Sequence, residues 1–374
     1  MTIANLSVDT LSRLQGLAPD WPGGFWWHLL LFTVLIIAFV LIMVIVTIYI
    51  ERRGIAFFAA RVGPNRTGPF GIFQAFADGI KALLKESITP VSADKIAYWL
   101  APAVVFAPVI MVFAVVPFSD GALLADLNIG ILFVVAISSI STIGVFMAGW
   151  GSSNKYSLLG AMRMVASVIS YEIPIILSVA GIVIIVGSLS LNDIVLAQQD
   201  IPFILLQPLG FLLLFIGGCA EINRSPFDLM EADSEIVAGF HIEYSGIKFA
   251  MFYLGEYGEA VVMSTIITVL FLGGWRGPVL PPWLWFVLKV AFMFFIMVWT
   301  RATLPRVRID QLMAIAWKFL FPLALLNLII TAIQVLVWPD VLPWIVILIN
   351  FAIAGILILI GSRFYKLGWG RIEV

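Results

Sequence analysis

Nine long apolar runs divide the chain, and each is close to the roughly twenty residues that an α-helix needs to cross a bilayer. They lie near residues 26–50, 98–117, 129–150, 165–187, 203–219, 249–272, 283–300, 312–337 and 343–361. A segment in lipid must satisfy its own backbone hydrogen bonds, so runs of this length are expected to be helical. We therefore predict an all-α, polytopic membrane protein of about nine transmembrane helices, forming a single integral membrane domain over residues 1–374.

Composition supports a membrane protein and narrows its chemistry. Of the 374 residues, 62% are hydrophobic and 11% are charged, whereas soluble domains average roughly 25% charged residues. The single cysteine, Cys219, excludes an internal disulfide and a cysteine-ligated iron–sulfur cluster, which needs several thiolates. The two histidines, His28 and His241, are too few and too far apart for a conventional haem pair or zinc site. We expect no metal site in this chain and expect any redox cofactor to belong to a partner protein.

Basic residues gather on one side of the predicted spans. If the loop 51–97 faces the cytoplasm, so do eighteen of the 21 Lys and Arg residues, leaving Arg13 and Arg276 outside and Lys289 within a span. The eighteen are Arg52, Arg53, Arg61, Arg66, Lys81, Lys85, Lys95, Lys155, Arg163, Arg224, Lys248, Arg301, Arg306, Arg308, Lys318, Arg363, Lys366 and Arg371. Cytoplasmic loops carry an excess of Lys and Arg. We therefore predict an N-terminus outside and a C-terminus in the cytoplasm.

The polar loop 51–97 contains a short amphipathic helix. Gly-Pro turn signals precede it, and the helical pattern then runs from residue 71 to residue 86. One face carries Ile72, Phe73, Phe76, Ile80, Leu83 and Leu84, and the other carries Gln74, Asp78, Lys81 and Lys85. The segment is too short and too charged to cross a bilayer, so we predict that it lies in the membrane interface. The pattern fits a simple anchor as well as a functional helix.

The second polar stretch, residues 221–244, is strongly acidic. Its acidic residues are Glu221, Asp228, Glu231, Asp233, Glu235 and Glu243, with Arg224 as the one fixed positive charge. Runs of like charge are usually solvated and disordered, but apolar residues such as Phe227 and Phe240 are interleaved with these charges. We therefore predict a folded cytoplasmic loop over 220–248. The basic stretch 301–311 could pair with this loop or dock a soluble partner.

Three carboxylates fall inside predicted spans. Glu172 lies about 20 Å along its helix from the cytoplasmic start, at a rise of about 1.5 Å per residue. An ionisable side chain at that depth is costly in lipid and marks a proton or substrate path by default, although a carboxyl paired with Arg163 for packing is an alternative. Glu256 and Glu259, at i and i+3, share one helix face. Two carboxylates so close in a low dielectric resist ionising together, which suits a proton relay.

Three stretches of the chain resemble the signatures of one family. They are ERRGIAFFAARVGPNRTGPFGIFQAFADGIKALLKE at 51–86, KYSLLGAMRMVASVISYE at 155–172 and AEINRSPFDLMEADSEIVAGFHIEY at 220–244. The family is the membrane subunit, called H in bacteria and 1 in mitochondria, of proton-pumping NADH:quinone oxidoreductase, respiratory complex I. The resemblance covers roughly residues 45–335. It implies a subunit that forms the quinone entrance and chamber and links quinone reduction to proton translocation.

The resemblance also implies roles for individual residues. Proton coupling would fall to Glu172, Glu221, Glu231, Asp233, Glu235, Glu243 and Glu256. The quinone chamber or its entrance would involve Arg52, Arg61, Phe73, Asp78, Lys81, Arg163, Phe227 and Asp228. Asp233 stands where the family pattern has Glu, a shorter side chain of the same charge. No role is implied for Glu259 or for the ninth span.

The resemblance further implies quinone as substrate, with FMN and iron–sulfur clusters in partner subunits and no redox centre in this chain. Expected partners are the peripheral-arm subunits of the quinone site and the small and antiporter-like subunits of the membrane arm, in a bacterial inner membrane. Related subunits of hydrogenase- or ferredoxin-linked complexes keep the electron donor open. A proton-coupled secondary transporter is a second alternative, although we find no internal repeat of the kind common in transporters. A purely structural anchor is a third, and it leaves the membrane-depth carboxylates unexplained.

Overall fold

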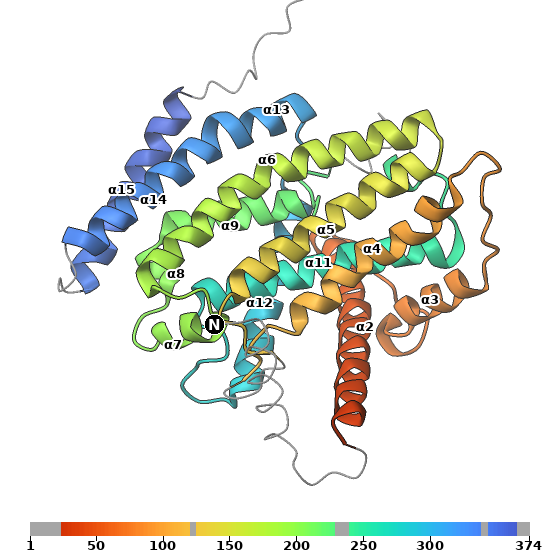
Figure 1. Cartoon of the computed structure of the whole chain (residues 1–374), viewed down its shortest axis with the longest axis horizontal. Helices are drawn as coiled ribbons and strands as arrows, with labels where there is room; N and C mark the ends of the chain where they lie inside the picture. Colours follow the sequence, from red (N-terminus) through yellow and green to blue (C-terminus); the bar gives the residue numbers. More distant parts are fainter. Residues whose placement is uncertain (1–23, 120–124, 229–238, 338–342, 365–374) are drawn as a thin grey trace, which may run out of the picture.

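The computed structural model describes residues 24–119, 125–228, 239–337 and 343–364, and every regular element in these ranges is helical (Figure 1). Within these described ranges, seven helices are long and apolar enough to span a membrane, and two shorter apolar helices accompany them. Together they occupy the nine predicted positions, so the all-α, polytopic membrane fold is confirmed. The nine are α2 (Gly24–Phe58), α4 (Lys95–Phe113), α5 (Gly130–Gly151), α6 (Lys155–Val186), α9 (Pro208–Glu221), α11 (Gly246–Phe271), α12 (Pro282–Thr303), α14 (Phe321–Val337) and α15 (Pro343–Phe364).

Short helical segments connect or extend these spans. They are η1 (Pro69–Gly71), α3 (Gln74–Leu84), α7 (Leu191–Ala197), α8 (Phe203–Leu206), η2 (Gly239–His241), α13 (Ile309–Ala314) and η3 (Ile315–Leu320). The last of them is a π-helical segment that joins α13 to α14 without a break, so one apolar helix runs over Ile309–Val337.

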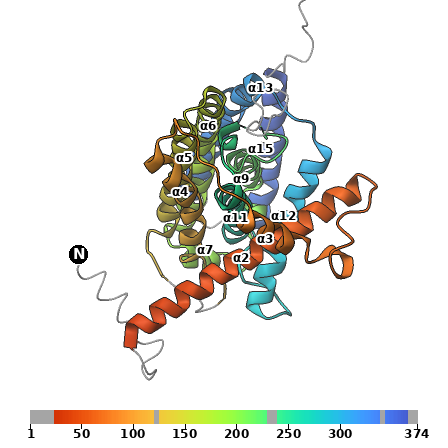
Figure 2. The same cartoon turned by 90° about the vertical axis from the view of Figure 1, so that its right-hand side faces the viewer.

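Helix α11 lies at the centre of the bundle. Of its most apolar eighteen residues, 72% are buried, against 17% for α2. It packs against α4, α12 and α2, while α6 packs against α5, α9 and α14. Helix α2 crosses the other spans steeply and carries α3 beside its C-terminal end (Figures 1 and 2). Helix α11 is thus surrounded by helices from both halves of the chain. Most polar side chains on it therefore lie in the interior of the bundle.

One predicted span is broken. Residues 203–219 form two helices, α8 and α9, that meet at Gln207. Pro208 follows, and a residue before proline is disfavoured in the α region, so Gln207 takes φ −131° and ψ 65°. Its side-chain amide then donates to Thr331 Oγ1 on α14 at 2.7 Å. The break therefore places a polar side chain between helices of the bundle.

Two helices extend beyond their predicted ends. Helix α6 begins at Lys155 rather than near residue 165, because the Asn154 side chain accepts from the backbone N–H of Tyr156 and caps the helix. Helix α2 continues eight residues past position 50 to Phe58, through the charged triplet 51–53. Glutamate and arginine have good helix propensity, so this triplet ends the apolar run without ending the helix.

The amphipathic helix predicted over 71–86 is present as α3, preceded by the turn η1. All six residues of its predicted apolar face are exposed in this chain: Ile72, Phe73, Phe76, Ile80, Leu83 and Leu84. Ala75, on the opposite side, is buried. The polar face meets α2 through Arg52, which pairs with Asp78 at 2.5 Å. The helix therefore turns its polar side to the protein and its apolar side away from it.

Candidate functional site

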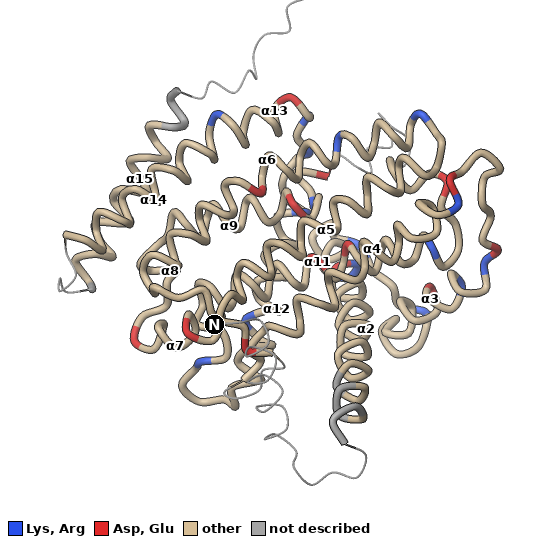
Figure 3. The backbone as a smooth tube through the Cα atoms, viewed as in Figure 1, with Lys and Arg blue, Asp and Glu red and all other residues tan. Residues whose placement is uncertain are grey.

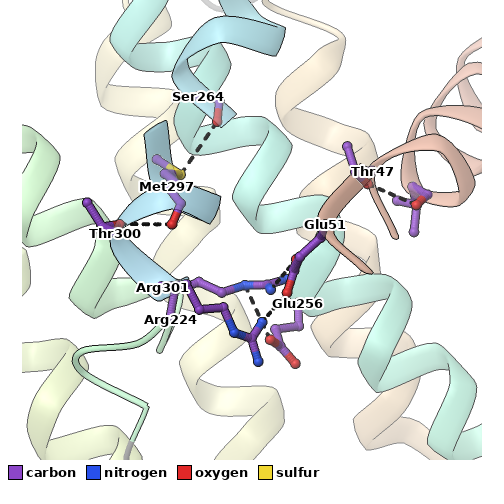
Figure 4. Close-up of polar contacts among 9 residues, drawn as sticks. Thr47, Glu51, Arg224, Glu256, Ser264, Met297, Thr300 and Arg301 are labelled. Atoms are coloured by element: carbon purple, nitrogen blue, oxygen red, sulfur yellow. Dashed lines mark hydrogen bonds and ion pairs between the residues drawn. The ribbon is translucent and has the colours of Figure 1, made fainter. Parts of the chain in front are cut away.

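An ionic cluster in the interior joins four parts of the chain: the C-terminal part of α2, the segment after α9, α11 and α12 (Figure 4). Arg224 Nη1 lies 2.5 Å from Glu51 Oε2, and both side chains are at most 5% exposed. Arg301 of α12 donates to the other carboxylate oxygen of Glu51. Arg224 Nε also lies 3.4 Å from Glu256 Oε1 on α11. Two cations and two anions thus neutralise one another inside the bundle.

Arg224 is held charged within this cluster. Burial would lower its pKa, but the carboxylates of Glu256 and Glu51 outweigh that effect and raise the pKa above its ordinary value. Its guanidinium also lies 4.3 Å from the ring centroid of Tyr257, in a cation–π contact. The chain reaches this point because Asn223, with φ 50°, turns it away from the end of α9. Asparagine tolerates this left-handed conformation better than most residues.

A cavity of about 70 Å³ lies deeper in the bundle, among α4, α5, α6, α9 and α11. Its walls are mainly apolar, but three carboxylates line it: Glu172 on α6, Glu221 on α9 and Glu259 on α11. Figure 3 shows that the long helices of the bundle carry few charged positions along their length. Since about 10–15 Å³ is enough for one water molecule, the cavity has room for several. Carboxylates that face water inside a low dielectric can exchange protons.

Three serines of α5 contact these three carboxylates. The Ser139 hydroxyl donates to Glu172 Oε1. Ser138 lies within hydrogen-bonding reach of Glu221, and Ser141 within reach of Glu259. One turn of a single helix therefore provides a hydroxyl for each carboxylate of the cavity, and a hydroxyl can both donate and accept.

A second cavity of about 30 Å³ lies between the first one and the acidic stretch. Its polar lining consists of Asn223, His241, Tyr253, Glu256 and Glu259. Burial lowers the pKa of His241 to about 4. The imidazole is therefore neutral near pH 7, with one nitrogen able to donate and the other to accept.

The described part of the acidic stretch is folded against the spans. Asn154 Nδ2 donates to Glu243 Oε1 at 2.7 Å, and the Tyr98 hydroxyl donates to the Glu243 carbonyl at 2.8 Å. The Tyr98 and Tyr244 rings stack at 4.2 Å. The described ends of this stretch therefore pack against the spans, whereas Glu231, Asp233 and Glu235 lie outside the described residues.

The basic stretch 301–311 pairs with the acidic one. Arg306 Nη2 lies 3.2 Å from Asp228 Oδ1, and its Nε donates to the Asp228 carbonyl. The Val307 N–H donates to the Pro226 carbonyl at 3.0 Å. Phe227 is buried, and its ring centroid lies 5.6 Å from that of Tyr171. The pairing predicted as one of two options is therefore present.

The remaining predicted residues lie apart from the carboxylate cavities. Asp78 bonds Arg52 and Gln74, and Lys81 lies 3.9 Å from its carboxylate. Phe73 and Arg61 are exposed near the end of α2. Arg163 is half-buried on α6. The structure thus separates a surface group around α3 from an interior group around Glu221 and Glu256.

Comparison with known proteins decides the family. The family model described as NADH dehydrogenase matches residues 31–332. The chain belongs to the NADH dehydrogenase family. A relative from Dehalococcoides mccartyi (strain CBDB1) is 57% identical over 352 residues, covering 94% of this chain and 99% of that protein. One from Brevibacillus brevis is 48% identical over 331 residues, covering 87% and 98%. Both are named as the H subunit of NADH-quinone oxidoreductase, so the resemblance indicated by the three signature stretches is confirmed.

The match to the NADH dehydrogenase family covers α3, both cavities and the ionic cluster, and it ends within α14. The ninth span, α15, lies beyond it. That span nevertheless contacts the rest of the bundle, because Asn350 Nδ2 donates to the Leu206 carbonyl at 2.6 Å, beside the break at Gln207.

Sequence reasoning missed several of the interior groups in this NADH dehydrogenase homologue. Glu51 stands at the end of a predicted span, but it is 3% exposed. The sequence signal that could have indicated its burial is helical spacing, because Val40, Val44, Thr47 and Glu51 form one buried face of α2. The serines of α5 carry a second signal, the run ISSIS at 137–141 in an otherwise apolar span. Interhelical contacts in membranes are enriched in such small polar residues.

Proposed function

We propose that this chain is the H subunit of a bacterial NADH:quinone oxidoreductase and that it links quinone reduction to proton translocation. The observation that carries the proposal is the continuous set of ionisable groups between the acidic stretch and the bundle interior. Arg224 contacts Glu256. Glu221, three residues before Arg224, lines the 70 Å³ cavity with Glu172. A charge change at the loop would thus act on carboxylates inside the membrane-spanning bundle.

The electrostatic reason is the low dielectric of the bundle. Coulomb interactions grow as the effective dielectric constant falls. Quinone reduction consumes two protons and passes through anionic forms, so it changes the field at any chamber beside the acidic stretch. Glu256 would respond first, because it shares Arg224 with Glu51. A change in the charge of Glu256 would alter how strongly the interior carboxylates hold their protons.

The quinone would enter beside α3. Its exposed apolar face, which includes Phe73 and Phe76, would meet lipid or the isoprenoid tail. Its polar face is fixed to α2 by the pair of Arg52 with Asp78. Arg53 adds a hydrogen bond to the Phe70 carbonyl at 2.8 Å. Arg61, Lys81, Arg163, Phe227 and Asp228 complete the proposed entrance and chamber wall.

Electron transfer would take place in partner subunits. The single cysteine and two histidines of this sequence cannot provide an electron-transfer chain. FMN and iron–sulfur clusters would belong to the peripheral arm, and small and antiporter-like subunits would continue the membrane arm. The names of the relatives favour NADH over hydrogen or ferredoxin as the electron source. The distribution of Lys and Arg supports a C-terminus on the cytoplasmic side of the plasma membrane.

The test is purification of the tagged chain in mild detergent from its native host. A chain with the proposed function would bring flavin and iron–sulfur proteins with it, and the preparation would reduce quinone with NADH. A secondary transporter would purify without flavin. A preparation that contains the partner subunits but reduces quinone with ferredoxin or hydrogen, and not with NADH, would contradict the assignment of the donor.

A further inference from the structure

The two cavities share part of their walls. Three side chains line both of them: Met164 on α6, Ile222 after α9 and Glu259 on α11. Met164 and Ile222 are buried and apolar. Among these shared side chains, only Glu259 can bind and release a proton. Glu259 thus stands at the junction between the cavity of Glu256 and that of Glu172 and Glu221.

The second cavity is built for a polar occupant. Asn223 lines it and is 5% exposed, and its Oδ1 is buried with no hydrogen-bond partner among the described residues. A buried acceptor without a partner costs about 1–3 kcal/mol, and a water molecule would remove that cost. The volume of about 30 Å³ accommodates water. Glu256, His241 and Glu259 line the same space.

Contacts on both sides of Glu259 complete a chain of exchangeable protons. Glu256 precedes it by three residues, on the same face of α11. Ser141, within hydrogen-bonding reach of Glu259, lies on α5 one turn from Ser138 near Glu221 and Ser139 bonded to Glu172. The second cavity is lined by both Glu256 and Glu259, and the first cavity is lined by Glu259, Glu221 and Glu172.

We propose that Glu259 relays protons between the Glu256 cavity and the Glu172–Glu221 cavity. This inference rests on the proposed coupling function. The carboxylate of Glu259 accepts a proton from water or Glu256 on one side, and the resulting acid releases it to water or Glu221 on the other. Glu259 returns to its starting state after each transfer, so no other reactant is consumed. The direction of transfer follows the charge state of Glu256, which the Arg224 cluster controls.

The test uses the whole complex in proteoliposomes, with NADH-driven quinone reduction and proton pumping measured together. Glu259→Gln keeps the size of the side chain but carries no titratable proton, so both rates should fall by about ten-fold or more. Glu259→Asp keeps the carboxyl and should retain most of each rate. If Glu259 served packing alone, the order would be reversed, because glutamine is the closer match in shape.

A second variant tests the junction without touching the carboxyl. Ile222→Phe fills the space shared by the cavities and should lower both rates as Glu259→Gln does. Parental rates in a fully assembled complex carrying either variant would overturn the proposal.

Glu256→Gln distinguishes a failure of the Glu259 relay from a failure of the proposed coupling function. If it lowers both rates while Glu259→Gln does not, the relay fails and the coupling function stands. If the unsubstituted complex pumps no protons, the coupling function itself fails.

Discussion

Arg224 and Glu51, 173 positions apart in the chain, are joined by a 2.5 Å ion pair inside the bundle. The pair connects the acidic stretch to the end of α2, and Arg301 and Glu256 extend it to α12 and α11. Paired charges of this kind add little net stability, but removing one partner leaves an unpaired buried charge. The cluster therefore fixes the relative positions of the elements on either side of the proposed chamber.

Glu51→Gln should destabilise the protein by about 3–5 kcal/mol, since Arg224 and Arg301 would both lose their shared anion. The measurement is the thermal midpoint of the purified complex and the yield of assembled protein. Asp200→Asn, at an exposed acidic position, is the matched control and should change neither quantity. Equal midpoints for the two variants would show that the buried cluster does not hold the fold together.

Phe73→Trp or Ala77→Trp should raise the apparent KM for long-tailed quinones more than for short-tailed ones. Both positions lie on or beside the exposed face of α3, where added bulk would hinder an isoprenoid tail. Leu336→Trp, at an exposed apolar position on α14, controls for the general effect of a surface tryptophan. An equal change in KM for the two quinone classes would leave α3 as a simple membrane anchor.

His241 should make the stability of the protein depend on pH below neutrality. Its pKa is about 4 when folded and 6.5 ordinarily, so the unfolded chain binds a proton as pH falls through 6.5 while the folded protein does not. The unfolding free energy should therefore fall between pH 6.5 and pH 4. His241→Gln should flatten this part of the curve. An unchanged slope in thermal midpoints measured across that range would exclude the effect.

Side-specific labelling should confirm the proposed orientation. Val62 and Val279 are 80% and 85% exposed and lie in polar loops that the prediction places on opposite sides of the membrane. The native Cys219 is buried at 3% exposure and gives little background. A membrane-impermeant maleimide should label Val62→Cys only from the cytoplasm and Val279→Cys only from the outside. The reverse pattern would invert the topology.

The sequence predicted the spans well because the apolar runs are long and bilayer thickness fixes their length. It predicted the amphipathic helix α3 too, since this helix has one apolar and one charged face. The break at Gln207 could be predicted in principle, because Pro208 follows it. The ends of α2 and α6 could not be found from hydropathy, since both helices continue through charged residues.

The interior site was harder to predict. Glu172 and Glu256 stand out because a charge within an apolar span is rare. Glu51 does not, because two arginines beside it suggest a water-exposed helix end. The pairing of Glu51 with Arg224, 173 positions away, depends on how α2 packs beside the segment after α9, which no local pattern specifies. For the same reason, the helical spacing places Glu259 beside Glu256 on one face, but its position between two cavities emerges only from the packed bundle.

The central claim is that buried carboxylates couple quinone reduction to proton translocation. It is tested most directly by Glu221→Gln and Glu256→Gln in proteoliposomes, with both activities followed in the same sample. Both variants should assemble the full peripheral arm and should lose quinone reduction and proton pumping in parallel. Complexes that assemble fully and both reduce quinone and pump protons at the parental rate would contradict it.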